Sequence, residues 1–212
     1  MNQRYSSLWR SNNVFCFLGD VRDMEKIEQL SQDVDILIHC AAFKHVILSE
    51  YNPFDVVQMN IIGVENVIRD ARACGAKNVL FTSSDKAVNP TNVMGHIKTY
   101  GREAYNRGNA VRNSSDGIFS STRFGNVIGS RGSVVPLFIK QIRSGWPVAV
   151  TDKRMTRFVM TIEEYARLVL ESVTLSKGGE VFVTKMPIVR IPDLTAVMFW
   201  ELKFRDYLVF GI

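Results

Sequence analysis

The sequence of 212 residues lacks the features that mark membrane, secreted and zinc-binding proteins. No apolar run approaches the roughly eighteen residues that a membrane span needs, and the first fifteen residues lack the apolar core of a signal peptide. The three cysteines are odd in number and lack metal-ligand spacing, so we expect no disulfide framework and no metal, but buried thiols in a reducing cytoplasm. These cysteines are Cys16, Cys40 and Cys74.

Most of the chain carries little net charge, and the excess of positive charge lies in one region. The net charge is +5, and between Thr122 and Arg167 eight basic residues oppose three acidic ones. A solvated basic face is one interpretation, and nucleic-acid binding is another. Glycine and aromatic residues separate these basic residues, which favours a pocket for a compact anion such as a nucleotide diphosphate. We therefore expect no nucleic-acid partner.

Short apolar runs that alternate with helical patterns predict one α/β unit with a small appendage. The run 14–18 is apolar throughout, as in a strand that is buried on both faces. We expect the last helix and the last strand to complete a small C-terminal lobe. The expected strands are 14–18, 35–42, 79–84, 118–124 and 180–184, and the expected helices are 22–32, 53–75, 92–111, 136–144 and 162–176.

The stretch from Val79 to Lys98 combines an apolar strand with polar groups at its end. The strand VLFTSS runs directly into Asp85 and Lys86, and a turn at 89–90 leads into the next helix. Open α/β folds place their chemistry at the carboxyl ends of parallel strands. An acid beside an ammonium at this edge can exchange protons with a substrate, although solvated loop charges explain the pair alone equally well.

This stretch resembles a known family of enzymes. SSDKAVNPTNVMG, followed by Lys98, is similar to the extended short-chain dehydrogenases, and within them to the CapD-like nucleotide-sugar 4,6-dehydratases. Their usual signature is Tyr-x-x-x-Lys, but Met94 takes the tyrosine position here, as in a branch that acts on UDP-N-acetylglucosamine. AAFKHV, RFGNVIGSRGSVVPLF and TDKRMTRF resemble the same family. The resemblance covers about residues 14–194 and is strongest at 79–98 and 123–158.

The resemblance implies a partial Rossmann-like, doubly wound parallel sheet with a small C-terminal substrate lobe. Rossmann sheets follow the strand order 3-2-1-4-5-6, with a glycine-rich pyrophosphate turn after strand 1. Residues 14–18 and 35–42 match strands 3 and 4, so strands 1 and 2 and their glycine-rich turn are missing. We expect a truncated or altered gene product. The expected division is an irregular lead-in (1–13), a partial NAD(P)-binding domain (14–128), a substrate lobe (129–194) and an atypical tail (195–212).

The resemblance also implies three groups of site residues. The catalytic group is Ser84, Asp85, Lys86, Met94 and Lys98. The cofactor, NADP or NAD, is expected to meet Asp20, Val21, Ala41, Ala42, Lys44, Asn60, Ser83 and Lys98. A UDP-sugar is expected to meet Lys44, His45, Asn126, Ser133, Val134, Arg154 and Arg157.

Several of these residues also have a structural interpretation. Asp20 is suited to capping the helix that follows it, and a lone histidine such as His45 is more often structural than catalytic. Asn60 is a poor residue for the middle of a helix, so it needs a hydrogen-bond partner. Glycines in the segment 125–133 have GxxxGxxG spacing after the fourth strand, so we reject a dinucleotide loop there.

The reaction implied by the resemblance removes water from a nucleotide-activated hexose without net redox change. Lys86 is expected to take the C5 proton, Asp85 to donate a proton to the C6 oxygen, and Lys98 to hold the nicotinamide ribose. Met94 has no exchangeable proton, so it is interpreted as a packing residue. The sugar 4-hydroxyl must then lose its proton elsewhere, with Asp85 or a water ordered by Ser84 as candidates.

Two other functions stay open. A nucleotide-sugar 4-epimerase would reprotonate C4 and has no need of an adjacent Asp85–Lys86 pair. A non-catalytic remnant, which binds a nucleotide sugar but no cofactor, is favoured by the two missing strands. The resemblance further implies a homo-oligomer in intact relatives. Some relatives carry an N-terminal membrane anchor, so the parent protein is either cytoplasmic or anchored through a missing region.

Overall fold

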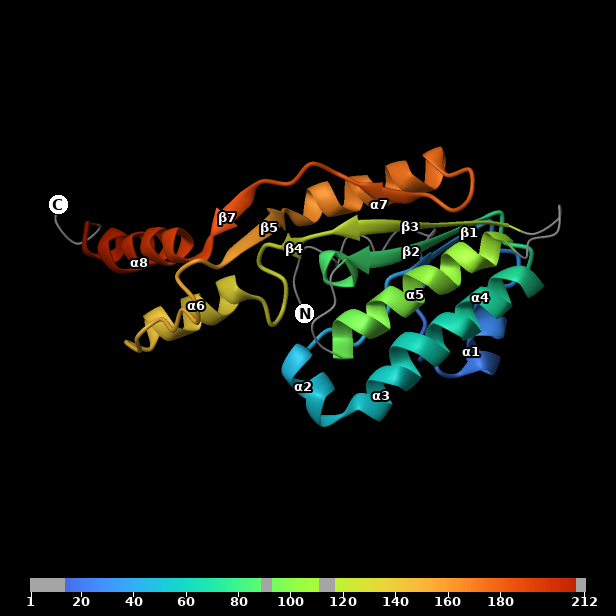
Figure 1. Ribbon diagram of the computed structural model, residues 1–212, viewed down its shortest axis with the longest axis horizontal. Helices are drawn as coiled ribbons and strands as arrows, with labels where there is room; N and C mark the ends of the chain where they lie inside the picture. Colours follow the sequence, from blue (N-terminus) through green and yellow to red (C-terminus); the bar gives the residue numbers. More distant parts are fainter. Residues whose placement is uncertain (1–13, 89–92, 111–116, 209–212) are drawn as a thin grey trace.

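A parallel sheet forms the centre of the computed structural model, which describes residues 14–88, 93–110 and 117–208. Its strands are β1 (Ile36–His39), β2 (Asn78–Ser84), β3 (Ile118–Phe124) and β6 (Val181–Val183). They lie in the order β1-β2-β3-β6, and every pair is parallel (Figure 1). Because all the strands are parallel, their carboxyl ends lie at one edge of the sheet.

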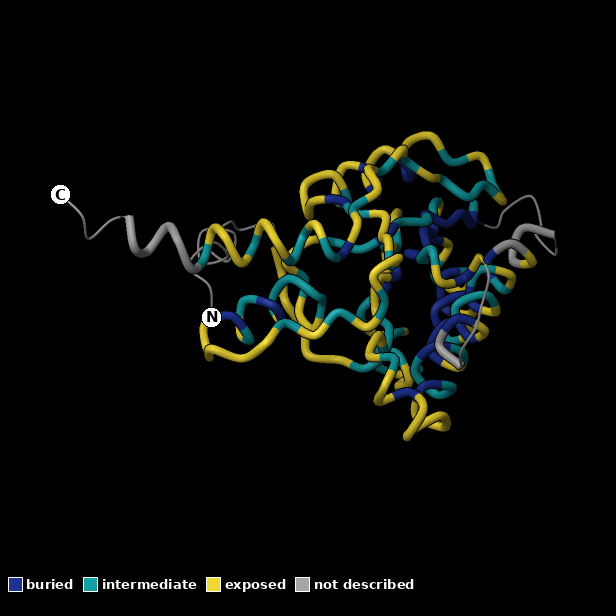
Figure 2. Tube along the Cα trace, turned by 60° about the vertical axis from the view of Figure 1, so that its left-hand side comes forward, coloured by how far each residue is buried: buried dark blue, intermediate teal, exposed yellow. Residues whose placement is uncertain are grey.

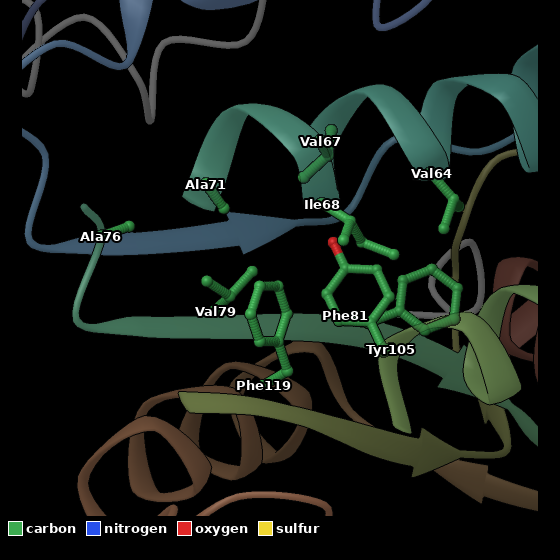
Figure 3. Close-up of a cluster of buried hydrophobic side chains, with 9 residues drawn as sticks. All are labelled: Val64, Val67, Ile68, Ala71, Ala76, Val79, Phe81, Tyr105 and Phe119. Carbon is green, nitrogen blue, oxygen red and sulfur yellow. The ribbon is translucent and has the colours of Figure 1, made fainter. Parts of the chain in front are cut away.

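Helices pack on both faces of this sheet. The helices α4 (Gly63–Ala73) and α5 (Val93–Ala110) cover one face, α7 (Ile162–Leu175) covers the other, and α1 (Met24–Leu30) packs against α4. Figure 2 shows the buried residues concentrated in the sheet and these helices. The larger core cluster, drawn in Figure 3, contains Val64, Val67, Ile68, Ala71, Ala76, Val79, Phe81, Tyr105 and Phe119.

The helical segment before β2 is interrupted, although the sequence predicts one helix over 53–75. The helix α2 (Val46–Tyr51) precedes α3 (Pro53–Val57), and a π-helical turn, η3 (Gln58–Ile62), joins α3 to α4. Asn60 lies in this turn. Wide turns of this kind concentrate at functional sites.

A second, smaller sheet adjoins the carboxyl end of β3. Its strands are β4 (Asn126–Val127), β5 (Thr156–Met160) and β7 (Ile188–Arg190), in the order β4-β5-β7. The β4–β5 pair is parallel and the β5–β7 pair is antiparallel. The helix α6 (Val134–Arg143) packs against the long helix α8 (Ile191–Leu208) beside this sheet (Figure 1).

The structure corrects three predictions about segments. Residues 14–18 form no strand, and Phe15 and Leu18 are 76% and 95% exposed, because an apolar run needs a neighbouring strand to form a ladder. The last helix and strand do not complete the small lobe, since α7 packs on β2 and β3, and β6 pairs with β3. Cys16 and Cys40 are exposed rather than buried.

Among the residues that the structure describes, no helix combines the length and hydropathy that crossing a bilayer requires.

Candidate active site

The strand β2 delivers the predicted acid and ammonium to the carboxyl edge of the sheet. It ends at Ser84 and continues into a single 3-10 turn, η4 (Asp85–Ala87). The Ser84 hydroxyl accepts a hydrogen bond from the Lys86 N–H at 3.1 Å and donates one to Asp85 Oδ1 at 3.2 Å. Lys86 Nζ lies 3.6 Å from the same carboxylate oxygen. Ser84 therefore orients the Asp85 carboxylate and holds the Lys86 backbone. The two predicted catalytic side chains remain 27% (Asp85) and 45% (Lys86) exposed.

The helix α5 brings Lys98 to the same part of the molecule. Lys98 Nζ lies 5.7 Å above the centroid of the Phe81 ring, and Phe81 belongs to β2. Burial, and then the positive charge of Lys86, lower the pKa of Lys98 to about 8. Met94 lies in α5, but its side chain and the predicted turn at 89–90 lie outside the described residues.

The loop after β1 is held by Asn60. Asn60 Oδ1 accepts a hydrogen bond from the Phe43 N–H at 2.7 Å, and Asn60 Nδ2 donates one to the Phe43 carbonyl at 3.0 Å. Asn60 is only 3% exposed, so the prediction that this residue needs a hydrogen-bond partner is confirmed. These two hydrogen bonds fix the backbone between the predicted cofactor residues Ala41 and Ala42 on one side and Lys44 on the other.

His45 joins this loop to the glycine-containing loop after β4. The Gly132 backbone has a φ of +73°, and a Cβ built there would lie 2.7 Å from His45 Cε1. Only glycine suits both the conformation and the space. The His45 and Lys44 side chains are both exposed, so they are open to a ligand.

A small cavity gathers most of the predicted sugar-binding residues. Its volume is about 60 Å³, and Asn126, Ser133, Val134 and Arg157 all line it. Asn126 Oδ1 and Ser133 Oγ are buried and have no hydrogen-bond partner among the described residues. Buried polar atoms without a partner are costly, so these two are available to a water or to a polar group of a ligand. Arg154 does not line the cavity, because its guanidinium pairs with Asp152 at 2.8 Å.

Sequence reasoning missed the residues that close this cavity from the C-terminal side. They are Val189 of β7 and Ile191 and Leu194 of α8. No local pattern marks them, because they reach the cavity only through the pairing of β7 with β5. Tyr165 was missed too, and its hydroxyl lies 3.7 Å from Cys40 Sγ.

The predicted adenine turn is present, but Asp20 does not cap the helix. Asp23 is the N-cap of α1 and accepts from the Lys26 N–H. Asp20 is instead occupied by Arg22, which donates from its backbone at 2.9 Å and from its guanidinium at 2.6 Å. These bonds lower the pKa of Asp20. Asn66 holds the turn by donating to the Val21 carbonyl at 3.0 Å.

His39 provides a pH-dependent term in the stability of this region. It is 3% exposed, and burial lowers its pKa from 6.5 to about 4, with a smaller contribution from the positive charge of Lys98. The unfolded chain therefore binds the proton more tightly. This contribution to stability is complete above pH 6.5 and is lost as the pH falls toward 4.

We expect the free energy of unfolding to drop by about 2 kcal/mol between pH 7 and pH 5 because of His39. Urea titrations at the two pH values measure this drop. His39→Phe keeps a ring against Phe81 but cannot bind a proton, so the drop should shrink by that amount. An equal drop in His39→Phe and in the wild-type chain would assign the effect to other groups.

The chain is similar to a defined family and to several curated proteins. A family model described as polysaccharide biosynthesis protein matches residues 1–207. An uncharacterized membrane protein of Methanocaldococcus jannaschii is 46% identical over 91% of this chain and 58% of its own length. An inverting UDP-N-acetylglucosamine 4,6-dehydratase of Campylobacter jejuni is 42% identical over 89% of this chain and 57% of its own length. The chain thus spans less than two thirds of these relatives.

Solved structures agree on the fold. The X-ray structure of Pen from Bacillus thuringiensis has a TM-score of 0.91 and 39% identity, over 98% of this chain and 63% of that one. A dTDP-glucose 4,6-dehydratase from Streptomyces venezuelae with bound NAD has a TM-score of 0.85 at 17% identity, over 95% of this chain and 68% of that one.

Among the curated relatives, a UDP-glucose 4-epimerase of Rickettsia canadensis is 37% identical over 81% of this chain and 50% of its own length.

Proposed function

Because the chain belongs to the polysaccharide biosynthesis protein family, we propose that it acts on a nucleotide sugar as a 4,6-dehydratase, with UDP-N-acetylglucosamine as the substrate. The observation that carries the proposal is the Asp85–Lys86 pair at the carboxyl end of β2. Removing water across C5 and C6 requires a base for the carbon-bound proton and an acid for the departing oxygen. A neutral Lys86 amine can act as the base, and a protonated Asp85 carboxyl group can act as the acid.

Residues at the edge of the sheet fit the nicotinamide end of NAD or NADP. Ala41 and Ala42 have side chains small enough for close approach of a ligand, and the buried Ser83 Oγ has no partner among the described residues. Lys98 supplies an ammonium for the ribose hydroxyls. The bound cofactor would accept hydride from sugar C4 and return it at C6. Asp20 and Val21 would lie by the adenine.

The proton steps fall to the residues of η4. Lys86 Nζ, as a neutral amine, takes the proton from C5. Asp85 takes the proton of the sugar 4-hydroxyl and donates it to the C6 oxygen, which leaves as water. The hydrogen bond from Ser84 to Asp85 Oδ1 orients the acid for this step. Hydride then reaches C6 and C5 regains a proton, so the net change is the loss of one water and the product is a 4-keto-6-deoxy sugar.

The residues that line the small cavity beside the small sheet would contact the diphosphate end of the nucleotide. Arg157 carries a guanidinium suited to bidentate contact with a diphosphate, and the free Asn126 and Ser133 oxygens suit polar groups of the ligand. The remaining lining is apolar. Lys44, His45 and Arg154 are exposed and would contact the ligand from outside this cavity.

Mass spectrometry of the reaction with UDP-N-acetylglucosamine tests the proposal. The chain is first titrated with NAD and with NADP, and the substrate is then added. We expect cofactor binding and a product that is lighter by one water. Isomerisation without loss of mass would support an epimerase such as the Rickettsia relative, and would refute the dehydratase proposal. Sugar binding without cofactor binding would identify a non-catalytic remnant.

The domain division and the assembly are part of the same proposal. We propose that the four-stranded sheet binds the cofactor and that the segment 129–194 contributes the sugar site, apart from α7 and β6. A homo-oligomer and a cytoplasmic location stay predictions, and sedimentation of the purified chain measures the first.

A further inference from the structure

Three residues of α5 face the same buried ring. Lys98, Gly101 and Tyr105 are spaced at three and four residues, which places them on one side of the helix. Lys98 Nζ lies 5.7 Å from the Phe81 centroid, and the Tyr105 ring lies 4.9 Å from it at an interplanar angle of 20°. Figure 3 shows the Tyr105 ring beside those of Phe81 and Phe119.

Gly101 lets α5 approach this ring closely. A Cβ built at Gly101 would lie 3.0 Å from Phe81 Cζ and 3.6 Å from Val64 Cγ2. The first distance is shorter than side chains tolerate without moving, so a residue larger than glycine would displace the ring or the helix. Lys98 lies one turn before Gly101, and its depth in the site therefore depends on this contact.

Phe81 is fixed from the neighbouring strand as well. His39 is its partner in the β1–β2 register, and the two rings stack at 5.6 Å with an interplanar angle of 17°. Phe81 is 2% exposed and His39 is 3% exposed. Contacts from β1, α4 and α5 therefore fix the plane of the Phe81 ring.

The charged form of Lys98 needs such a contact. Burial and the charge of Lys86 both oppose the ammonium, whereas Cys40 favours it weakly, and His39 on β1 is held neutral by its own burial. An aromatic face attracts a cation within about 6 Å of its centroid. No ion pair to Lys98 is found among residues 14–88, 93–110 and 117–208, so the Phe81 face adds to the weak attraction of Cys40 in favouring the ammonium.

We infer that Phe81 is a positioning residue, which holds the Lys98 ammonium at a fixed depth and direction in the site, and that Gly101 permits the approach on which this depends. The inference rests on the proposed function, in which Lys98 contacts the cofactor ribose. Phe81 itself touches neither cofactor nor substrate in this scheme.

Phe81→Leu keeps an apolar side chain but removes the π face. We expect the pKa of Lys98 to fall by about half a unit to one unit, and the affinity for NAD or NADP to fall roughly threefold to tenfold. NMR titration of the chain with carbon-13 methylated lysines measures the pKa, and Lys98→Gln assigns the signal. Fluorescence titration measures the affinity.

Phe119→Leu is the matched control. Phe119 is also a buried aromatic residue in contact with Tyr105, so its loss weakens the same core without removing the ring under Lys98. The Lys98 titration should be unchanged in this variant. An equal shift in Phe81→Leu and Phe119→Leu would overturn the inference, because a general loosening of the core would then explain both.

Gly101→Ala provides a second test if Phe81→Leu does not fold. The added Cβ should displace the Lys98 titration while the π face is kept, and an unchanged titration would contradict the inference. The proposed function is tested separately: a wild-type chain that binds neither NAD nor NADP would refute cofactor use. A Lys98 shift confined to the Phe81 and Gly101 variants would still support the positioning role.

Discussion

Replacing Lys86 by methionine is expected to lower the rate of dehydration by about a thousandfold. Positioned acid–base groups contribute factors of roughly 10² to 10⁴, and Lys86 is the proposed base for the C5 proton. Methionine keeps the length of the side chain and removes the proton acceptor. Because Ser84 receives a hydrogen bond from the Lys86 backbone, the η4 turn should persist in the variant. The rate is measured by mass spectrometry of the product at saturating substrate.

Lys77→Met is the matched control for this prediction. Lys77 is 78% exposed and pairs with Asp35 at 2.7 Å. It directly precedes β2, at the end of the strand opposite the site. Its loss should leave the rate within about twofold of wild type, since exposed ion pairs contribute little. A Lys86→Met variant that dehydrates at the wild-type rate would remove Lys86 from the mechanism and would leave Asp85 or another group as the base.

The elements that could be predicted from the sequence are those whose pattern is local. The run 118–124 is a strand over the expected range, and the helix over 162–176 ends one residue earlier than expected. In the helix, the spacing of Leu168, Val169 and Val173 matches the buried face, whereas the strand is buried along its middle, at 119–122. The run at 14–18 has the same apolar character but forms no strand, because a ladder depends on a second segment that the run itself does not encode.

The position of an element in the fold was harder to predict than its type. The strand β6 was expected at 180–184, but its pairing with β3 rather than with the small sheet depends on tertiary contacts. The site residues likewise divide into those that a local motif predicts and those that tertiary contacts bring in. The motifs GNVIGSRGS and MTRF predicted that Asn126, Ser133 and Arg157 meet at one ligand, and all three line the cavity. Ile191 and Leu194 line it too, from a segment beyond those motifs.

The π-helical turn could not be predicted, because one added residue per turn leaves no periodic trace over so short a segment. The sequence indicated only that Asn60 is an unsuitable residue for a helix interior. In the structure, Asn60 lies in this wider turn, and its side-chain amide bonds the backbone of the loop after β1. The π-helical turn and the two hydrogen bonds from Asn60 to Phe43 therefore belong to one local arrangement.

Asn60→Ala is accordingly expected to lower the free energy of unfolding by about 2–4 kcal/mol. The substitution leaves the Phe43 N–H and carbonyl without the partners that they have at 2.7 Å and 3.0 Å, in a region where Asn60 is 3% exposed. Urea unfolding measures the loss. Asn60→Asp should recover less than half of it, since a carboxylate can accept from the N–H but cannot donate to the carbonyl.

Asn66→Ala separates this effect from the general cost of removing an asparagine amide. Asn66 also donates to backbone carbonyls, those of Val21 and Arg22 at 3.0 Å and 3.2 Å, but it accepts no bond from the loop and lies partly exposed. Its loss should cost about 1 kcal/mol. If Asn60→Ala and Asn66→Ala lower the free energy of unfolding equally, the two hydrogen bonds to Phe43 contribute no more to stability than those of Asn66. A larger loss in Asn60→Ala, together with weaker cofactor binding, would show that the π-helical turn braces the loop on which Ala41, Ala42 and Lys44 stand.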